Sequence, residues 1–239
     1  MQAADYIYHA NNKTCHGFLA YEENTAYKKP AVLIAHDWSG RGPLVKEKAR
    51  LLAQMGYVGF AIDLYGQGQI GISVEEKKAL MTPFLEDRAL LRNSLQAVYD
   101  EVCLLPQVDS NNIAIIGFCF GGLCALDLAR SGANIKGAVS FHGILNKPEG
   151  LEQPPVTAKI LALHGYDDPM VSPQQVHSFC DEMNFLKVDW QMQMYGQVQH
   201  AFTNPEAHDK ASGLMYDALA AQRSWFAMSH FLQELFAPA

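Results

Sequence analysis

Three side chains in this sequence could together cleave a carbonyl compound: a thiol, a carboxylate and an imidazole. Cys119 lies in Gly117–Gly122, which reads GFCFGG and directly follows the apolar run Ile113–Ile116. Asp168 follows a later apolar run, and His200 lies in a loop further along the chain. An imidazole can take the proton of a thiol and later protonate a leaving group, while a carboxylate holds the imidazole in the required tautomer. These residue types therefore predict acyl transfer through a nucleophilic cysteine.

The segment around Cys119 has the pattern of a nucleophile elbow, a sharp turn from a buried strand into a helix. Turn residues, Asn111–Asn112, precede the strand, and Leu123–Arg130 has the apolar spacing of a helix. Gly117 and Gly121 lie two positions either side of the cysteine, where side chains would clash. A thiol at a helix N-terminus is also favoured as thiolate. The alternative is a buried structural cysteine in a glycine-rich turn of another α/β protein.

Acyl transfer also requires fixed N–H donors for the oxyanion, each worth about 3 kcal/mol. We expect the backbone N–H of Phe120, directly after the nucleophile, to be one donor. The loop after the apolar run Ala31–Ala35 should supply the other, and we assign it to the backbone N–H of Trp38.

Other residues compete for the acid and the base. Asp167 precedes Asp168, and either carboxylate could instead cap the helix that follows. His200 could be an ordinary loop histidine. Three further histidines follow expected strands: His36, His142 and His164. We interpret His164 as shaping the turn before Asp168, because it precedes that residue too closely to be its partner.

Apolar runs of strand length alternate with amphipathic helical segments along the chain. Strands are expected as a hairpin within 5–21 around Asn11-Asn12-Lys13, and at 31–35, 57–64, 113–116, 135–141, 159–163 and 188–195. Helices are expected at 43–55, 74–104 with an interruption near Pro83, 123–130, 172–184 and 210–236. This alternation predicts an α/β fold with a mostly parallel sheet covered by helices on both faces. Ligands of such sheets bind at the carboxyl ends of the strands.

Composition restricts the class of protein. The chain has 239 residues, 49% hydrophobic, and a net charge of −7, so no basic face indicates nucleic acid or an anionic membrane as a partner. Neither a composition break nor a repeat divides the chain, which predicts one domain over residues 1–239. No membrane span is predicted, and the N-terminal residues lack the pattern of a signal peptide.

The cysteines are odd in number and scattered: Cys15, Cys103, Cys119, Cys124 and Cys180. Their spacing predicts neither a zinc site nor a disulfide framework. We interpret Cys103, Cys124 and Cys180 as small core residues on helical faces. We expect a cytoplasmic protein in a reducing environment, without metal or cofactor.

The order nucleophile, acid, histidine is that of α/β-hydrolase triads. Given this order of residues, the chain resembles the dienelactone hydrolase family of α/β-hydrolases over nearly its full length. The matching segments read AVLIAHDWSG, FAIDLYG, GFCFGG, AVSFHG, LHGYDDPMV and HAFTNP. The resemblance implies the α/β-hydrolase fold, Cys119, Asp168 and His200 as the triad, and hydrolysis of an ester or lactone through an acyl-cysteine. It favours Asp168 over Asp167, because the family's acid lies three residues before the valine that is Val171 here.

The sequence departs from the family's pattern in two places. A glutamate that contacts the resting thiol in the family is Asp37 here, one methylene shorter. The arginines that hold a substrate carboxylate have no counterpart, since the helical segment after residue 73 offers Lys77 and Lys78 instead. Lysine does not replace a bidentate arginine equivalently. The resemblance to the family therefore supports the type of reaction more strongly than it supports the family's substrate.

We expect the pocket walls to come from Trp38, Tyr65, the segment Gly66–Pro83, His142 and Phe202. The expected partner is a small-molecule ester or lactone, bound by a monomer or homodimer. Other hypotheses are a thioesterase or peptidase-like hydrolase on the same scaffold, and a degenerate module that only binds a small ligand. A thiol redox switch would need a resolving cysteine, and Cys124 is poorly placed to serve as one.

Overall fold

The computed structural model describes residues 1–23 and 27–237 and divides into two compact units, Met1–Ile116 and Gly117–Ala239. The division does not test the expectation of one domain over residues 1–239, which stays a prediction.

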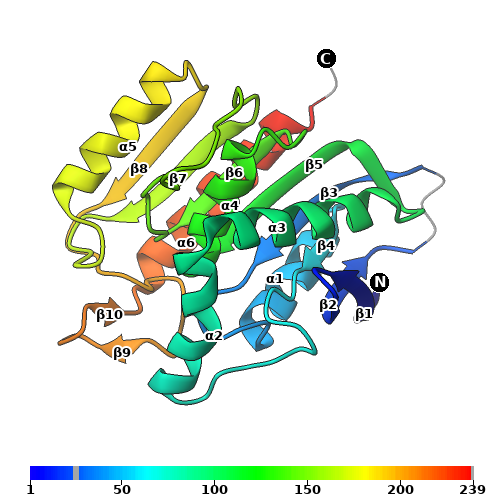
Figure 1. Ribbon diagram of the computed structural model, residues 1–239, viewed down its shortest axis with the longest axis horizontal. Coiled ribbons are helices and arrows are strands. Elements are labelled where there is room, and N and C mark those ends of the chain that lie inside the picture. The colour runs from blue at the N-terminus through cyan, green and yellow to red at the C-terminus, as the bar shows by residue number, and fades with distance from the viewer. Residues whose placement is uncertain (24–26, 238–239) are drawn as a thin grey trace. The chain divides into compact units, whose positions relative to one another are not determined.

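The first unit is built on a mixed sheet with the strand order β1-β2-β4-β3-β5 (Figure 1). Its strands are β1 (Gln2–Ala10), β2 (Lys13–Tyr21), β3 (Lys29–Ala35), β4 (Val58–Ala61) and most of β5 (Val108–Phe118). β1 and β2 form the expected hairpin, whose turn residues Asn11 and Asn12 have φ angles of 49° and 59°. Asparagine tolerates this left-handed conformation, which a two-residue hairpin turn requires. β3 and β4 pair in parallel.

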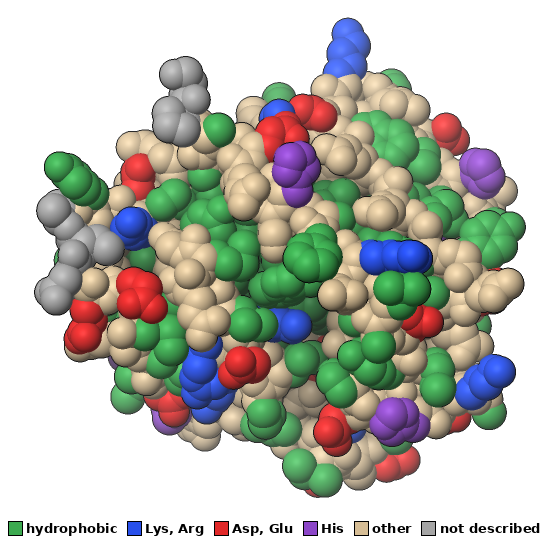
Figure 2. Space-filling view, turned by 180° about the vertical axis from the view of Figure 1, so that it is seen from behind, with side chains coloured by type: hydrophobic (Ala, Val, Ile, Leu, Met, Phe, Trp, Pro, Cys, Tyr) green, Lys and Arg blue, Asp and Glu red, His purple; other side chains and the backbone are tan. Residues whose placement is uncertain are grey.

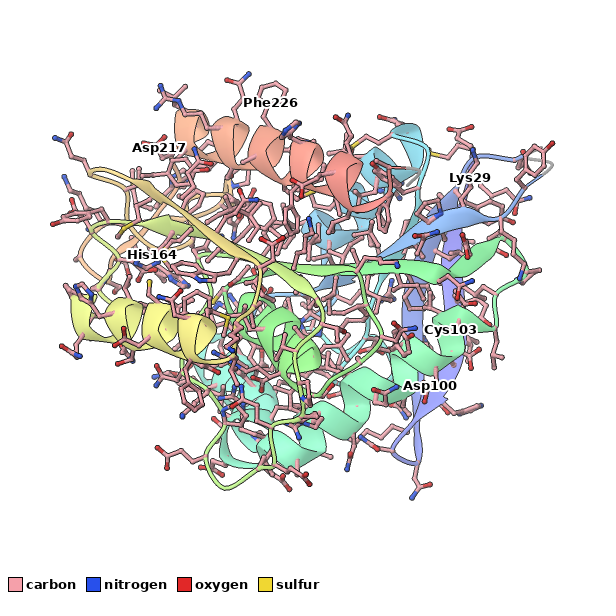
Figure 3. The ribbon with its side chains drawn as sticks, turned by 90° about the horizontal axis from the view of Figure 1, so that it is seen from above. Lys29, Asp100, Cys103, His164, Asp217 and Phe226 are labelled. Atoms are coloured by element: carbon pink, nitrogen blue, oxygen red, sulfur yellow. The ribbon has the colours of Figure 1, made fainter. Side chains whose placement is uncertain are left out.

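Helices cover both faces of this part of the sheet, with α1 on one face and α3 on the other (Figure 3). The helices of the first unit are α1 (Pro43–Gln54), α2 (Val74–Glu86) and α3 (Arg88–Cys103). The break expected near Pro83 falls at Asp87, since Pro83 lies inside α2. Asp87 ends α2 and caps α3 by accepting the N–H of Leu90 at 2.8 Å. The carboxylate cap, rather than the missing N–H of the proline, therefore fixes the boundary.

The second unit begins with the end of β5 and continues in parallel strands. Its elements are α4 (Phe120–Arg130), β6 (Gly137–Phe141), β7 (Lys159–Gly165), α5 (Pro173–Phe185), β8 (Trp190–Tyr195), β9 (His208–Asp209), β10 (Leu214–Met215) and α6 (Ala218–Leu235). α6 lies on one face of these strands, and α4 and α5 lie on the other (Figure 3). Every residue of β6 is buried, as expected for a parallel strand with both faces covered.

Further expected elements differ in this structure, and the strand expected over 57–64 covers only Val58–Ala61. The helix expected over 210–236 begins only at Ala218, where Asp217 caps it by accepting the N–H of Ala220 at 2.8 Å. The residues before it form the antiparallel pair β9 and β10. Asn111 and Asn112, expected in a turn, lie inside β5, where both bond the side chain of Asp109. Local polar contacts within the strand thus replace the turn.

Among the residues that the structure describes, the face of the molecule shown in Figure 2 has no separate basic region, as expected from the net charge of the sequence. Lysine and arginine side chains are interspersed with aspartate and glutamate over the face shown in Figure 2. Within residues 1–23 and 27–237, no helix combines the length and the apolar character that crossing a membrane requires.

Candidate active site

Cys119 occupies the turn between β5 and α4. It is the N-cap of α4, with φ of 55° and ψ of −116°, and its backbone N–H donates to the carbonyl of Phe141 at 3.0 Å. A positive φ is uncommon for a residue other than glycine, and such strain concentrates at functional positions. A Cβ atom at Gly117 would overlap the carbonyl oxygen of Gly121. The turn therefore has the close backbone approach of a nucleophile elbow.

His200 and Asp168 form a buried pair in the same unit. The Nδ1 atom of His200 donates to Oδ2 of Asp168 over 2.7 Å, and neither side chain is exposed. The other carboxylate oxygen, Oδ1, accepts the backbone N–H of Met170 at 2.8 Å. An ionised carboxylate only accepts hydrogen bonds, so the pair fixes the proton on Nδ1. The acid expected at residue 168, rather than Asp167, is the one bonded to His200.

Cys119 interacts with the same imidazole. Burial lowers the pKa of His200, but the negative charge of the Cys119 thiolate and the hydrogen bond to Asp168 outweigh it and raise this pKa to about 10. Nε2 of His200 is buried and makes no conventional hydrogen bond to any described residue. The raised pKa keeps the imidazole of His200 protonated at neutral pH.

A segment that the sequence analysis missed holds the backbone of His200. The N–H of His200 donates to the carbonyl of Gly213 at 2.9 Å, and the N–H of Met215 donates to the carbonyl of His200 at 3.0 Å. Gly213 has φ of 73°. Before it, Asp209, Lys210 and Ser212 are polar, and polar residues followed by a glycine are a turn signal that could have indicated this hairpin.

The other expected residues of the second unit lie around the pair. The ring of His142 lies 5.1 Å from the ring of His200 and 5.0 Å from the ring of Phe202. Phe202 has no exposed surface and also packs on Tyr195 at 5.4 Å. His164 is buried at the end of β7 and lies on the α5 side in Figure 3. Assignment of His142 and Phe202 to a substrate pocket stays a prediction.

Asp37, Trp38 and Tyr65 belong to the first unit, where Tyr65 contacts Trp38 and Asp37 bonds Ser39. Asp37 accepts the backbone N–H of Ser39 at 2.8 Å and also its hydroxyl. The hydroxyl of Tyr65 donates to the carbonyl of Trp38 at 3.0 Å, which ties the loop after β3 to the loop after β4. The ammonium of Lys77 lies 5.5 Å from the centre of the Trp38 ring. The roles assigned to Asp37, Trp38 and Tyr65 stay predictions, as does that of the Phe120 N–H at the start of α4.

In the part of the chain that the structure describes, no group of three or more histidine, cysteine, aspartate or glutamate side chains is arranged to hold a metal ion.

Comparison with solved structures confirms the expected fold class. P91, a dienelactone hydrolase-like promiscuous phosphotriesterase from metagenomic libraries, is 34% identical, with a TM-score of 0.93 over 99% of both chains. An esterase of Thermogutta terrifontis, only 17% identical, shares the fold with a TM-score of 0.67 over 99% of this chain and 96% of its own. The chain has the α/β-hydrolase fold, a mostly parallel sheet with helices on both faces.

Sequence relatives agree with this likeness. A probable 2-oxo-3-(5-oxofuran-2-ylidene)propanoate lactonase of Bradyrhizobium is 30% identical over 82% of this chain and 80% of its own. A Caenorhabditis elegans protein of uncharacterised activity, K02A2.1, is 38% identical over 62% of this chain and 95% of its own. Residues 15–236 match the dienelactone hydrolase family. The chain therefore belongs to the dienelactone hydrolase family and is an ester or lactone hydrolase.

Proposed function

We propose that this hydrolase cleaves a carboxylic ester or lactone through an acyl-cysteine, with Cys119 as nucleophile, His200 as base and acid, and Asp168 as the residue that orients His200. The observation that carries the proposal is the buried hydrogen bond of 2.7 Å between His200 and Asp168, on an imidazole that also interacts with Cys119. All three side chains belong to one compact unit.

Acylation follows from the charges of this pair. The Cys119 thiolate attacks the carbonyl carbon, and the carbonyl electron pair moves onto oxygen to give a tetrahedral oxyanion. The backbone N–H groups of Phe120 and Trp38 are our candidates for stabilising that oxyanion. When the intermediate collapses, the leaving alkoxide takes the proton of the His200 imidazolium and departs as an alcohol. The enzyme is left as a thioester with a neutral His200.

Deacylation reverses the roles of the histidine. His200 takes a proton from water while the water oxygen attacks the thioester carbon. Collapse of the second tetrahedral intermediate breaks the carbon–sulfur bond and releases the carboxylic acid. The thiolate and the imidazolium are then both restored, so no oxidant, metal or further reactant is needed.

The substrate is proposed to be a small neutral ester or lactone. The name of the Bradyrhizobium lactonase supports a lactone, but the propanoate in that name is an anion, so the proposed neutral charge rests on the residues of α2 alone. The lysines on α2 replace the arginines that would clamp a carboxylate, and a lysine does not reproduce a bidentate contact. A thioesterase or peptidase-like activity, a cytoplasmic location and a monomeric or homodimeric state stay predictions.

The test is a comparison of cysteine variants on an activated acetyl ester. Cys119→Ala should lower kcat by at least about 10⁴-fold. Cys180→Ala is the matched control, because it removes a half-buried thiol on α5 and should leave kcat unchanged. Rapid quenching followed by mass spectrometry should find one acetyl group on the peptide that contains Cys119. Full activity in Cys119→Ala would reject both the nucleophile and the acyl-cysteine.

A second candidate substrate is a phosphotriester, favoured by the 34% identity to P91 over 99% of both chains. The thiolate would attack phosphorus, and the aryloxide would leave with the proton of His200. Release of aryloxide from an aryl dialkyl phosphate by the wild-type chain, but not by Cys119→Ala, would support it. Absence of turnover beyond a single equivalent would reject phosphotriester hydrolysis while leaving ester hydrolysis standing.

A further inference from the structure

His142 has an unusual backbone at the end of β6. Its φ angle is 40°, in the left-handed region that few residues other than glycine adopt, although histidine is found there more often than most. Its N–H donates to the carbonyl of Leu163 at 2.8 Å, which anchors this conformation to the end of β7. Strain of this kind persists only where the surrounding contacts fix the residue, and it is frequent at functional sites.

The side chain of His142 makes its closest contacts with one short segment, residues 200–203, and its ring also lies 6.3 Å from the ring of Phe118. Its Nε2 atom lies 2.7 Å from the hydroxyl oxygen of Thr203, and its ring packs edge-to-face on His200 and Phe202 with interplanar angles of 68° and 76°. Ring centres of 5.0 and 5.1 Å lie within the favourable range for such pairs. The segment turns sharply at Ala201, whose φ is 59°, so anchoring the residues after it also fixes the direction of His200.

The His142 ring is suited to lie beside a cation. Burial and the positive charge of His200 lower the pKa of His142 well below 6.5, so its ring is neutral when His200 is protonated. Only 2% of His142 is exposed, and its Nδ1 atom has no hydrogen-bond partner among the described residues. A buried polar atom without a partner is a cost that a phenylalanine at this position would avoid. The hydrogen bond to Thr203 is what an imidazole adds over a phenyl ring.

We propose that His142 is a positioning residue: it clamps residues 200–203 through Thr203 and Phe202 and so holds the His200 imidazole toward Cys119. The proposal rests on the proposed function, because it assigns His142 to the same Cys119–His200 pair. Misplacing a catalytic group by about 1 Å can cost on the order of 10²-fold in rate. A residue that acts only by positioning His200 can therefore have a measurable effect on kcat.

Two substitutions separate the hydrogen bond from the ring packing. His142→Phe keeps an aromatic ring but loses the bond to Thr203, and Thr203→Val loses the same bond from the other side. Each should lower kcat about 10- to 100-fold while KM stays within about twofold. Thr203→Ser restores the hydroxyl and should return kcat to within about threefold of wild type. His230→Phe changes an exposed histidine on α6 and should have no effect.

A spectroscopic measurement distinguishes positioning from a structural role. The ultraviolet absorbance of the Cys119 thiolate, taken as the difference between each protein and its Cys119→Ala partner, reports directly on the pairing with His200. In His142→Phe and Thr203→Val the thiolate absorbance should appear only at higher pH than in wild type. Folding is checked by circular dichroism, and Thr203→Val, the smaller change, decides the question if His142→Phe does not fold.

The results that would reject the positioning role of His142 differ from those that would reject the proposed function. Wild-type kcat and wild-type thiolate absorbance in both variants would overturn the positioning proposal, whatever Cys119 does. Activity retained in Cys119→Ala would overturn the proposed function, while a shifted thiolate titration in Thr203→Val would still support positioning of His200 by His142.

Discussion

His200 Nδ1 and Asp168 Oδ2 lie 2.7 Å apart, and both side chains are fully buried. The backbone N–H of Met170 bonds the other carboxylate oxygen, so Asp168 is held on both sides. This relationship determines which ring nitrogen of His200 can exchange protons with Cys119, because the proton on Nδ1 is committed to the carboxylate. In the proposed mechanism, Nε2 is therefore the nitrogen that exchanges protons with the thiol and the leaving group.

Asp168→Asn should therefore disable the imidazole while preserving the shape of the site. An asparagine amide can donate to Nδ1 and stabilise the wrong tautomer, so we expect kcat to fall by about 10⁴-fold. The measurement is steady-state hydrolysis of an activated ester, with circular dichroism as the check on folding. Asp167→Asn is the control, since the neighbouring carboxylate is not bonded to His200. A larger loss in Asp167→Asn than in Asp168→Asn would contradict our assignment of the acid.

The pH dependence of activity should reflect the raised pKa of His200. Burial lowers this pKa, but the Cys119 thiolate and Asp168 raise it to about 10, above the ordinary value of 6.5. His200 must be protonated to release the leaving group, so kcat/KM should hold at neutral and mildly alkaline pH and decline as the pH rises through about 10. A pH profile with an alkali-stable ester measures this. A decline centred near 6.5 would show that the thiolate does not support the imidazolium.

Gly117→Ala should disrupt the turn that presents Cys119. The new Cβ would overlap the carbonyl oxygen of Gly121, and relieving it costs about 1–3 kcal/mol of unfolding free energy. Thermal denaturation and ester hydrolysis should both decline. Gly196→Ala is the control, because no heavy atom lies within 4 Å of its added Cβ. Equal stability of the two variants would mean that the turn accommodates a side chain.

Gly213→Ala tests the hairpin that bonds the backbone of His200. Alanine at a φ of 73° costs about 1–2 kcal/mol, and its Cβ would overlap the ring of Pro169. We expect kcat to fall at least about 10-fold, because the carbonyl of Gly213 accepts the N–H of His200.

Gly132→Ala is the control for Gly213→Ala, because it introduces a similar backbone strain. Gly132 has φ of 76° and lies against Pro154, but it follows the end of α4 opposite to Cys119. The Gly132→Ala variant should lose about as much unfolding free energy as Gly213→Ala and keep its hydrolytic activity. Parallel loss of activity in both variants would attribute the effect to stability alone.

Much of the fold could be predicted where local chemistry decides the structure. Ser172 and Pro173 were expected to begin a helix, and Ser172 does cap α5, accepting the N–H of Gln175 at 3.3 Å. The apolar run after Asn112 was expected to be a strand, and β5 contains it. Such signals depend on a few neighbouring residues, so the sequence alone is sufficient to read them.

The differences arise where distant segments decide the structure. Residues 210–217 have enough helix-forming side chains to suggest an extension of α6, yet they form β10 and its turn because their backbone bonds His200. The packing of His142 on His200 brings together residues far apart in the chain, and no spacing rule predicts it. The candidate triad was readable because each member follows a strand of a parallel sheet, where topology rather than sequence distance sets proximity.

The boundary between the two compact units has a consequence for how such an enzyme diversifies. Cys119, Asp168 and His200 all follow Ile116, whereas Asp37, Trp38, Tyr65 and the lysines of α2 precede it. Under the proposed function, replacements among residues 36–86 leave all three residues of the candidate triad unchanged. Libraries confined to residues 36–86 therefore test the expected pocket residues of the first unit separately from His142 and Phe202, which belong to the second unit.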